Sequence, residues 1–281
     1  MSATSTSSDK GSYFRSLHQG EGAFIMPNPW DVGTARILAS QGFKALATTS
    51  AGMAFALGKP EGQTSRDDVL AHCRMMVEAT DLPVSADLEK GFGDSPEAVA
   101  ETIHAAAATG LAGCSIEDHT NRPDDPIFAI DLAVERIQAA VEACRSLDHD
   151  FVLTARAENF LWERPDLDDT IARLQAFEKA GADVLYAPGL RDLETIRSVC
   201  AALEKPVNVI MGMPGVTFGK DELAEAGVKR ISVGSALARA VLGTFLRAGE
   251  EMVNDGSFSF AGDAAGFDEL QTIFSGFIQQ S

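Results

Sequence analysis

Residues 83–93 read Pro-Val-Ser-Ala-Asp-Leu-Glu-Lys-Gly-Phe-Gly, a short apolar run that leads directly into two acids, Asp87 and Glu89. Two later apolar runs of the same kind end in Glu117 and in Arg156. Each run follows a stretch with helical periodicity, which is the pattern of a parallel sheet with helical crossovers. Because the carboxyl ends of parallel strands meet at one end of such a fold, we expect these charged side chains to converge there.

Eight runs of this kind divide the chain, and helical patterns separate them. The predicted strands are Ala23–Met26, Lys44–Thr48, Pro83–Asp87, Gly113–Glu117, Phe151–Ala155, Asp183–Tyr186, Pro206–Ile210 and Arg230–Val233. Eight βα units without a Pro/Gly-rich linker favour an α/β fold of the closed (β/α)8 TIM barrel type over an open doubly wound sheet. No Gly-x-Gly-x-x-Gly follows the first strand, which argues against a dinucleotide-binding fold.

The barrel does not account for the whole chain. We expect residues 1–12, which are rich in Ser and Thr, to be a disordered tail, residues 13–255 to be the barrel, and residues 256–281 to be a C-terminal helical extension. In the extension, residues 264–280 place apolar side chains on one helical face, namely Phe267, Leu270, Ile273, Phe274 and Phe277. Such a face needs an apolar partner. Two placements remain open: a neighbouring subunit, with which the helix is swapped, or the chain's own barrel.

The composition limits the binding partners and the cellular compartment that we expect for this protein. The formal net charge of −18 over 281 residues argues against nucleic acid and against an anionic membrane surface as partners. The four cysteines form no Cys-x-x-Cys pair, which is typical of reduced thiols in a cytosol. No apolar run reaches the length of a membrane span, and the first residues lack the apolar core of a signal peptide, so we expect a cytoplasmic protein.

Oxygen ligands for a metal are grouped at two adjacent predicted strand ends. Asp87 and Glu89 are two residues apart, so both face the same side of an extended segment, and Glu117 comes from the next strand. Carboxylates in this arrangement suit Mg²⁺ or Mn²⁺, because Mg²⁺ takes one or two carboxylates and keeps waters and substrate oxygens. The alternative is that all three acids are solvated loop charges.

Other strand ends carry groups that suit an anionic substrate. Arg156 presents a planar fork for a carboxylate or enolate oxygen, although an ion pair with Glu117 or Glu158 would explain it equally well. Backbone N–H groups at Thr49 and Ser50 could stabilise an anionic oxygen, or could belong to a plain polar strand end.

A rival hypothesis is a sugar-phosphate substrate. Residues 232–236, Ser-Val-Gly-Ser-Ala, could cradle a phosphate at the start of the last barrel helix, or could be an ordinary helix cap. The histidines form no His-x-x-x-His pair, and His119 is the one that follows the Glu117-Asp118 pair near the proposed site.

Together these stretches resemble the isocitrate lyase/phosphoenolpyruvate mutase superfamily, from about Phe24 to Ala240. The resemblance rests on Asn28-Pro29-Trp30-Asp31, Gly42-Phe43-Lys44-Ala45-Leu46 with Thr49-Ser50, Asp87-x-Glu89-x-Gly91-Phe92-Gly93, Ile116-Glu117-Asp118 and Ala155-Arg156. It implies a (β/α)8 barrel whose last helix is swapped between subunits, in a homo-oligomer such as a dimer or tetramer. It also implies cleavage of a C–C or C–P bond beside a carbonyl, through an enolate-type intermediate.

The resemblance further implies roles for individual residues. Mg²⁺ (or Mn²⁺) would be held by Asp87, Glu89 and Glu117, partly through water. The small 2-oxo carboxylate substrate would contact Trp30, Thr49, Ser50, Asp87, Arg156 and Asn208.

Several positions depart from the family pattern. The segment after the acidic pair, His119 to Pro126, lacks the Cys of the lyase loop, so isocitrate lyase activity is not expected. Glu89 and Glu61 stand where relatives carry Asp, and Pro188 stands where the mutase has His. The catalytic residues that we predict are therefore Arg156, with Glu61 or His119 as the proton donor; Tyr186 is a further candidate donor.

The sequence thus predicts a Mg²⁺-dependent lyase or hydrolase that acts on a small 2-oxo acid such as oxaloacetate. The alternatives are phosphonopyruvate-type C–P cleavage, a phosphate-binding barrel aldolase or isomerase, and a non-catalytic protein that binds 2-oxo acids.

Overall fold

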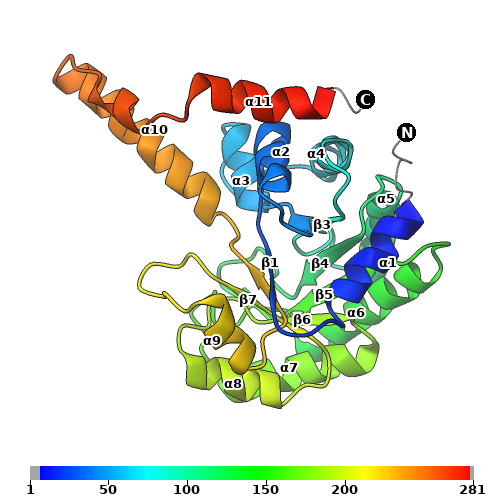
Figure 1. The fold of residues 1–281 in the computed structure, drawn as a ribbon. Helices are drawn as coiled ribbons and strands as arrows, with labels where there is room; N and C mark the ends of the chain where they lie inside the picture. The colour runs from blue at the N-terminus through cyan, green and yellow to red at the C-terminus, as the bar shows by residue number, and fades with distance from the viewer. Residues whose placement is uncertain (1–6, 279–281) are drawn as a thin grey trace.

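The computed structural model describes residues 7–278, and its centre is a parallel sheet rolled into a barrel (Figure 1). The strands are β1 (Phe24–Met26), β2 (Leu46–Ala47), β3 (Val84–Asp87), β4 (Gly113–Glu117), β5 (Val152–Arg156), β6 (Val184–Tyr186), β7 (Val207–Ile210) and β8 (Arg230–Ser232). They pair in the order β1-β8-β7-β6-β5-β4-β3-β2, all parallel. The predicted (β/α)8 barrel is confirmed.

The last seam of the barrel, between β1 and β2, is held by hydrogen bonds rather than by a strand ladder. The Ala47 backbone N–H donates to the Pro27 carbonyl oxygen at 3.0 Å. One residue further, the Asn28 side-chain amide donates to the Thr48 carbonyl oxygen at 2.9 Å. These bonds draw the ends of β1 and β2 together, so the strand ends form a ring.

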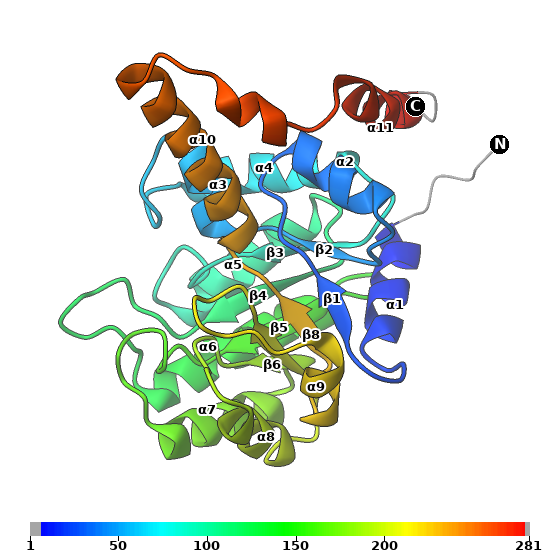
Figure 2. The ribbon, with the colours of Figure 1, turned by 60° about the vertical axis from the view of Figure 1, so that its left-hand side comes forward.

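Helices surround the barrel, and Figure 2 shows them from a second side. The helices are α1 (Ser7–Leu17), α2 (Val32–Ser40), α3 (Ser50–Ala56), α4 (Arg66–Glu78), α5 (Pro96–Ala107), α6 (Ile130–Arg145), α7 (Leu167–Ala180), α8 (Leu193–Ala201), α9 (Lys220–Glu225), α10 (Ala236–Asn254) and α11 (Phe267–Ile278), with a 3-10 turn η1 (Ser259–Asp263). Ser95 caps α5 by accepting from the Ala98 N–H, and Gly181 ends α7 at φ 112°, where a side chain would be strained. Within residues 7–278, no helix is both long and apolar enough to cross a membrane.

Helix α1 corrects our expectation for the start of the chain. Residues 1–6 lie outside the described part, but Ser7 to Ser12 belong to α1 rather than to a disordered tail. Phe14 is fully buried at the end of the barrel where the strands begin. Arg15 pairs with Asp150 at 3.1 Å and with Asp183 at 2.7 Å, so α1 is stabilised by contacts distant in sequence.

The C-terminal elements take two different positions (Figures 1 and 2). Helix α11 packs on α2 of its own chain, where the Arg36 guanidinium lies 5.5 Å from the centre of the Phe277 ring. Helix α10 projects away from the barrel, and only Ala238 of it is buried. Its exposed apolar face consists of Val241, Leu242, Phe245, Leu246, Met252 and Val253. Of the two placements left open for the C-terminal helix, the described part, α11, packs on its own barrel, and swapping between subunits stays a prediction; residues 279 and 280 lie outside the described part.

Burial of His18 makes the stability of the fold depend on pH. Desolvation, and next the charge of Arg230, lowers the pKa of His18 to about 3. Between that pKa and the ordinary value of about 6.5, the unfolded chain binds a proton that the folded chain does not. The free energy of unfolding is therefore not reduced by His18 above the unfolded pKa of about 6.5. It falls as the pH drops from there toward the folded pKa of about 3.

We expect His18→Gln to remove part of this acid sensitivity. Between about pH 6 and pH 4, the free energy of unfolding of the wild type should decrease more steeply than that of the variant, by up to about 1.4 kcal/mol per pH unit. Urea unfolding across this range measures both slopes. The matched control is the exposed His104→Gln on α5, which should keep the wild-type slope. Equal slopes in all three proteins would contradict the assignment.

Candidate active site

A cavity of about 320 Å³ opens where the strands end. Six of the predicted catalytic or substrate-binding residues line it: Thr49, Ser50, Glu61, Asp87, Arg156 and Asn208. A larger hollow of about 650 Å³ lies at the opposite end, but Arg15 there is already paired with Asp150 and Asp183. Since barrel enzymes place their chemistry at the C-terminal ends of the strands, the smaller cavity is the candidate active site.

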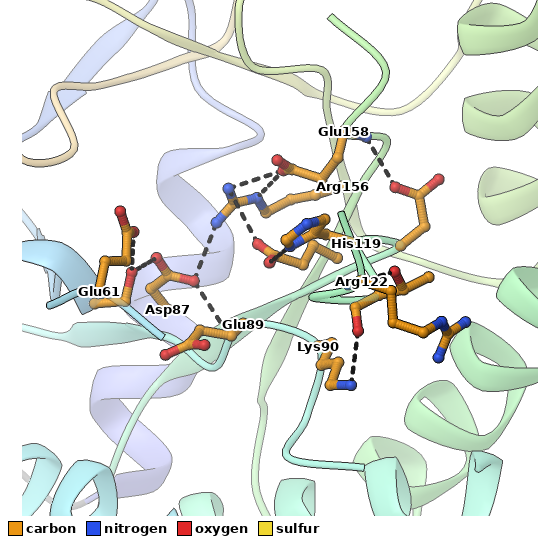
Figure 3. A network of polar contacts seen from close by, with 12 residues as sticks. Glu61, Asp87, Glu89, Lys90, His119, Arg122, Arg156 and Glu158 are labelled. Atoms are coloured by element: carbon orange, nitrogen blue, oxygen red, sulfur yellow. Dashed lines mark hydrogen bonds and ion pairs between the residues drawn. The ribbon is translucent and has the colours of Figure 1, made fainter. Parts of the chain in front are cut away.

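Arg156 is the centre of the charged network in this cavity (Figure 3). Its guanidinium contacts Asp87 at 3.0 Å, Glu117 at 3.2 Å and Glu158 at 2.8 Å. Burial opposes the charge, but Glu158, Glu117 and Asp87 outweigh it and hold the pKa of Arg156 well above its usual range. The ion-pair alternative that the sequence left open is therefore confirmed, and Arg156 also lines the cavity, while its contact with a substrate oxygen stays a prediction.

The strand register explains why these groups meet. Glu117 on β4 pairs with Arg156 on β5, and Arg156 pairs with Tyr186 on β6. On the other side Asp87 ends β3, and its backbone N–H donates to Thr48 Oγ1 at 3.0 Å. Neighbouring strand ends thus lie at the same height, which is what brings the carboxylates onto one guanidinium.

Ser50 links Asp87 to Glu61. Its hydroxyl oxygen lies 3.1 Å from Asp87 Oδ2 and 3.1 Å from Glu61 Oε1. A hydroxyl donates one proton, so both contacts are hydrogen bonds only when the second carboxyl carries a proton of its own. Burial, and then the charge of Asp87, raises the pKa of Glu61, which favours a proton on this carboxyl.

Glu89 reaches this network in a way that our sequence argument did not foresee. β3 ends at Asp87, and Glu89 has φ 50°, so the expectation that both acids share one face of an extended segment is wrong. The Glu89 N–H instead donates to Asp87 Oδ1 at 3.2 Å. Burial, followed by the charges of Asp87 and Glu61, raises the pKa of Glu89 to about 7.

The donor set fits a divalent cation. Glu89 Oε1 is buried without a hydrogen-bond partner, and burial raises the pKa of Glu117 well above its usual range even beside Arg156. Among residues 7–278, no three Asp, Glu, His or Cys side chains lie close enough to enclose an ion unaided. The unpartnered Glu89 oxygen fits Mg²⁺, which needs only one or two carboxylates and takes waters and substrate oxygens as its other ligands.

Asp118 lies outside the cavity and supports it from behind. Its carboxylate accepts from the Glu158 backbone N–H at 2.8 Å and from Arg173 Nη1 at 3.2 Å. Its own N–H donates to the Arg156 carbonyl oxygen. Asp118 thereby fixes the end of β5, which carries the two residues that face each other in the network, Arg156 and Glu158.

His119 has its own place beside the site. Its ring stacks on the Trp162 ring with centres 3.7 Å apart, and Nδ1 lies 3.8 Å from Glu117 Oε1. Burial, and next the charge of Lys90, lowers the pKa of His119 to about 4, so the ring is neutral near pH 7. His119 does not line the cavity, and a neutral imidazole there is a poor general acid.

Two backbone N–H groups just before α10 are already hydrogen-bonded to a side chain of the protein. Asn28 Oδ1 accepts from the backbone N–H groups of Val233 and Gly234, each at 2.9 Å. These are donors that a phosphate cradle at residues 232–236 would need, so the phosphate hypothesis loses its main support. Trp30 neighbours α3 but does not line the cavity.

The ion pair of Arg156 with Glu158 was one of the alternatives left open by the sequence, but Arg173 and Arg230 were not foreseen. Arg173 lies four residues after Asp169 on α7, a spacing typical of a surface pair. No local signal marks Arg230, because its partners come from β5, from β7 and from His18, the residue after α1.

The geometry agrees with what comparison with known proteins finds. A family profile for phosphoenolpyruvate phosphomutase matches residues 14–253. The chain belongs to this family. The 2-methylisocitrate lyase of Shewanella oneidensis is 33% identical over 225 residues, which cover 76% of this chain and 75% of that protein.

Two solved structures extend the comparison. A provisionally named lyase/mutase from Burkholderia cenocepacia is 57% identical with a TM-score of 0.93, and the match covers 95% of this chain and 96% of that one. Oxaloacetate acetylhydrolase with its product oxalate is 25% identical with a TM-score of 0.85, covering 96% and 94%. The chain is thus an enzyme of the isocitrate lyase/phosphoenolpyruvate mutase type, as its sequence predicted.

Removing the buried Asp118 should lower the free energy of unfolding much more than removing the exposed Asp169. Asp118 is 2% exposed and Asp169 39% exposed, and both pair with Arg173. We expect Asp118→Ala to lower the free energy of unfolding by about 3–5 kcal/mol, because it removes the buried charge partner of Arg173 Nη1 and the acceptor of the Glu158 backbone N–H. Asp169→Ala should cost about 1 kcal/mol. Urea denaturation compares the two, and similar losses would show that Asp118 is not the essential partner.

Proposed function

We propose that the chain is a Mg²⁺- or Mn²⁺-dependent lyase or hydrolase that cleaves a C–C bond beside the carbonyl of a small 2-oxo acid, with oxaloacetate as the substrate type. The observation that carries this proposal is the excess of acid around one guanidinium. The acids that interact with Arg156 or with its partners are Glu61, Asp87, Glu89, Glu117 and Glu158.

Asp87, Glu89 and Glu117 would hold the cation, with waters and substrate oxygens completing its shell. When bound, the ion stabilises the negative charge that develops on the carbonyl oxygen as the bond breaks. This role fits the unpartnered Glu89 oxygen and the raised pKa values of Glu89 and Glu117.

The 2-oxo acid end of the substrate would lie against Thr49 and Ser50. Both residues line the cavity, and their backbone N–H groups have no acceptor among the described residues. Arg156 would orient the same oxygens from the other wall, and Asn208 also lines this space. The similar protein oxaloacetate acetylhydrolase was solved with its product oxalate, which is a small carboxylate like the ligand proposed for this cavity.

Glu61 is the best-placed proton donor. It lines the cavity, its pKa is raised, and Ser50 connects it to Asp87. A carboxyl whose pKa is raised by burial is a better general acid toward the carbanion that C–C cleavage leaves. Phosphonopyruvate-type C–P cleavage is the second candidate, because the family profile is that of the phosphomutase.

The exposed face of α10 supports a homo-oligomer. Phe245 is 75% and Val253 85% exposed on a helix that projects from the barrel, and Phe245 also lines an apolar groove between α10 and the η1 segment. Apolar surface of this extent favours burial against another copy of the chain.

The metal assignment predicts a specific loss of binding. Asp87→Asn should reduce the affinity for oxalate in the presence of Mg²⁺ at least about 100-fold, because it removes charge from both the cation and Arg156. Isothermal titration calorimetry measures this. The control is Asp94→Asn, an acid of the β3–α5 loop paired with Lys90 and Arg122. Unchanged binding in Asp87→Asn would refute the metal site, and weak binding in both variants would indicate a general effect of charge.

The oligomer prediction is tested by mass. Phe245→Glu places a charge on the apolar face of α10 and should convert the assembly to smaller species in light scattering. Met75→Glu, at a half-exposed position on α4, is the control and should leave the mass unchanged. An unchanged mass for Phe245→Glu would mean that α10 is not the interface.

A further inference from the structure

A second guanidinium lies in the barrel interior, below the active-site network. Arg230 begins β8, is 3% exposed and lines the same cavity as Asp87 and Arg156. Its Nε donates to Asn208 Oδ1 at 2.8 Å and its Nη2 to Thr154 Oγ1 at 2.8 Å. Both acceptors are neutral.

The third partner of Arg230 is neutral as well. His18 Nε2 lies 3.2 Å from Arg230 Nη1, and His18 Nδ1 lies 2.9 Å from the Phe14 carbonyl oxygen. A carbonyl can only accept, so this network assigns the ring proton to Nδ1 and leaves Nε2 to accept from Arg230. The lowered pKa of His18, which has burial as its main cause, agrees with an uncharged ring.

No acid in residues 7–278 forms an ion pair with Arg230, although acids are abundant in the layer above it. The ionisable group that acts on it is Tyr186, and burial raises the pKa of that phenol to about 12. Burial lowers the pKa of Arg230 itself to about 9, which still leaves the guanidinium charged at neutral pH. A buried charge without a counter-charge is costly, so this position calls for an anion.

Arg136 shows what a purely structural buried arginine looks like in this chain. It is equally buried, but its guanidinium donates to the carbonyl oxygens of Lys90, Gly93 and Asp94 and lies over the Phe128 ring. It does not line the cavity. Each of the two guanidinium groups has three acceptors for its five N–H groups, but only the side chain of Arg230 borders open space, where a ligand can reach the unused N–H groups.

The cavity has room for a ligand at this depth. On β2, β3 and β4, small side chains line it, namely Ala47, Ser85 and Ser115. Barrels of this kind usually fill their interior with bulky branched residues. Thr154 precedes Arg156 by two residues on β5, so the Arg230 contacts lie roughly 6–7 Å below the Arg156 level.

We propose that Arg230, with Asn208 beside it, forms an anion-binding floor of the cavity that takes one carboxylate-type group. That group is either the second carboxylate of the substrate or a free small anion. Its charge neutralises Arg230 and its oxygens accept the unused N–H groups, as in bidentate arginine–carboxylate pairs. Only the first of the two sources rests on the proposed function.

Formate is the probe, because it carries one carboxylate and nothing else. In metal-free protein at constant ionic strength, formate about tenfold above its Kd should raise the wild-type Tm by about 2–3 °C. Arg230→Met should lose this rise. Arg230→Lys keeps the charge without the fork and should bind formate at least about tenfold more weakly. Arg247→Met, an arginine of α10 outside the cavity, is the control and should keep the full rise.

The proposal is overturned if formate does not raise the wild-type Tm, or if Arg230→Met or Arg230→Lys responds as the wild type does. The lysine variant decides the matter should the methionine variant not fold. The source of the anion follows from a second titration with Mg²⁺ and 3,3-difluorooxaloacetate, an inhibitor of oxaloacetate acetylhydrolase. Loss of the formate effect identifies the substrate's carboxylate, and additive effects identify a free anion. Failure of oxalate to bind with Mg²⁺, while formate still acts through Arg230, would refute the proposed function alone.

Discussion

The site depends on one electrostatic constraint: a single guanidinium, Arg156, is closed in with more carboxylates than it can neutralise. Three of them contact it directly, and two more stand behind Asp87. In a buried place, like charges that lack a partner take up protons or require a cation. The raised pKa values of Glu61, Glu89 and Glu117 are the first response, and the proposed divalent ion is the second.

The fold maintains this arrangement from two directions. Behind the site, Arg173 and Asp118 hold the end of β5, so that Arg156 and Glu158 keep their relative positions. Below it, helix α1 closes the barrel and brings His18 to Arg230. The cavity therefore has an acidic upper layer and a cationic floor. Such a division of charge suits an anionic substrate whose reactive end is bound with a metal and whose other end meets an arginine.

Much of this could be predicted from the sequence because it follows from periodicity. The eight strands agree with their predicted segments to within about two residues, and parallel pairing alone brings Asp87, Glu117 and Arg156 together. What local pattern does not determine was missed. Helix α1 depends on Phe14 and on ion pairs to distant residues, and Glu89 lies past the end of β3, where the alternation of strand faces no longer holds. His119 was placed by its neighbours in sequence, whereas the stack on Trp162 decides its position.

The most direct test of the central claim is proton release on metal binding. Because burial raises the pKa of Glu89 to about 7, this carboxyl is mostly protonated at about pH 6 and must lose its proton to accept a cation. Calorimetric titration of Mg²⁺ with oxalate, in two buffers that differ in ionisation enthalpy, counts the protons released. The account predicts release of at least about one proton by the wild type and clearly less by Glu89→Gln. Binding without proton release, or equal release by both proteins, would contradict it.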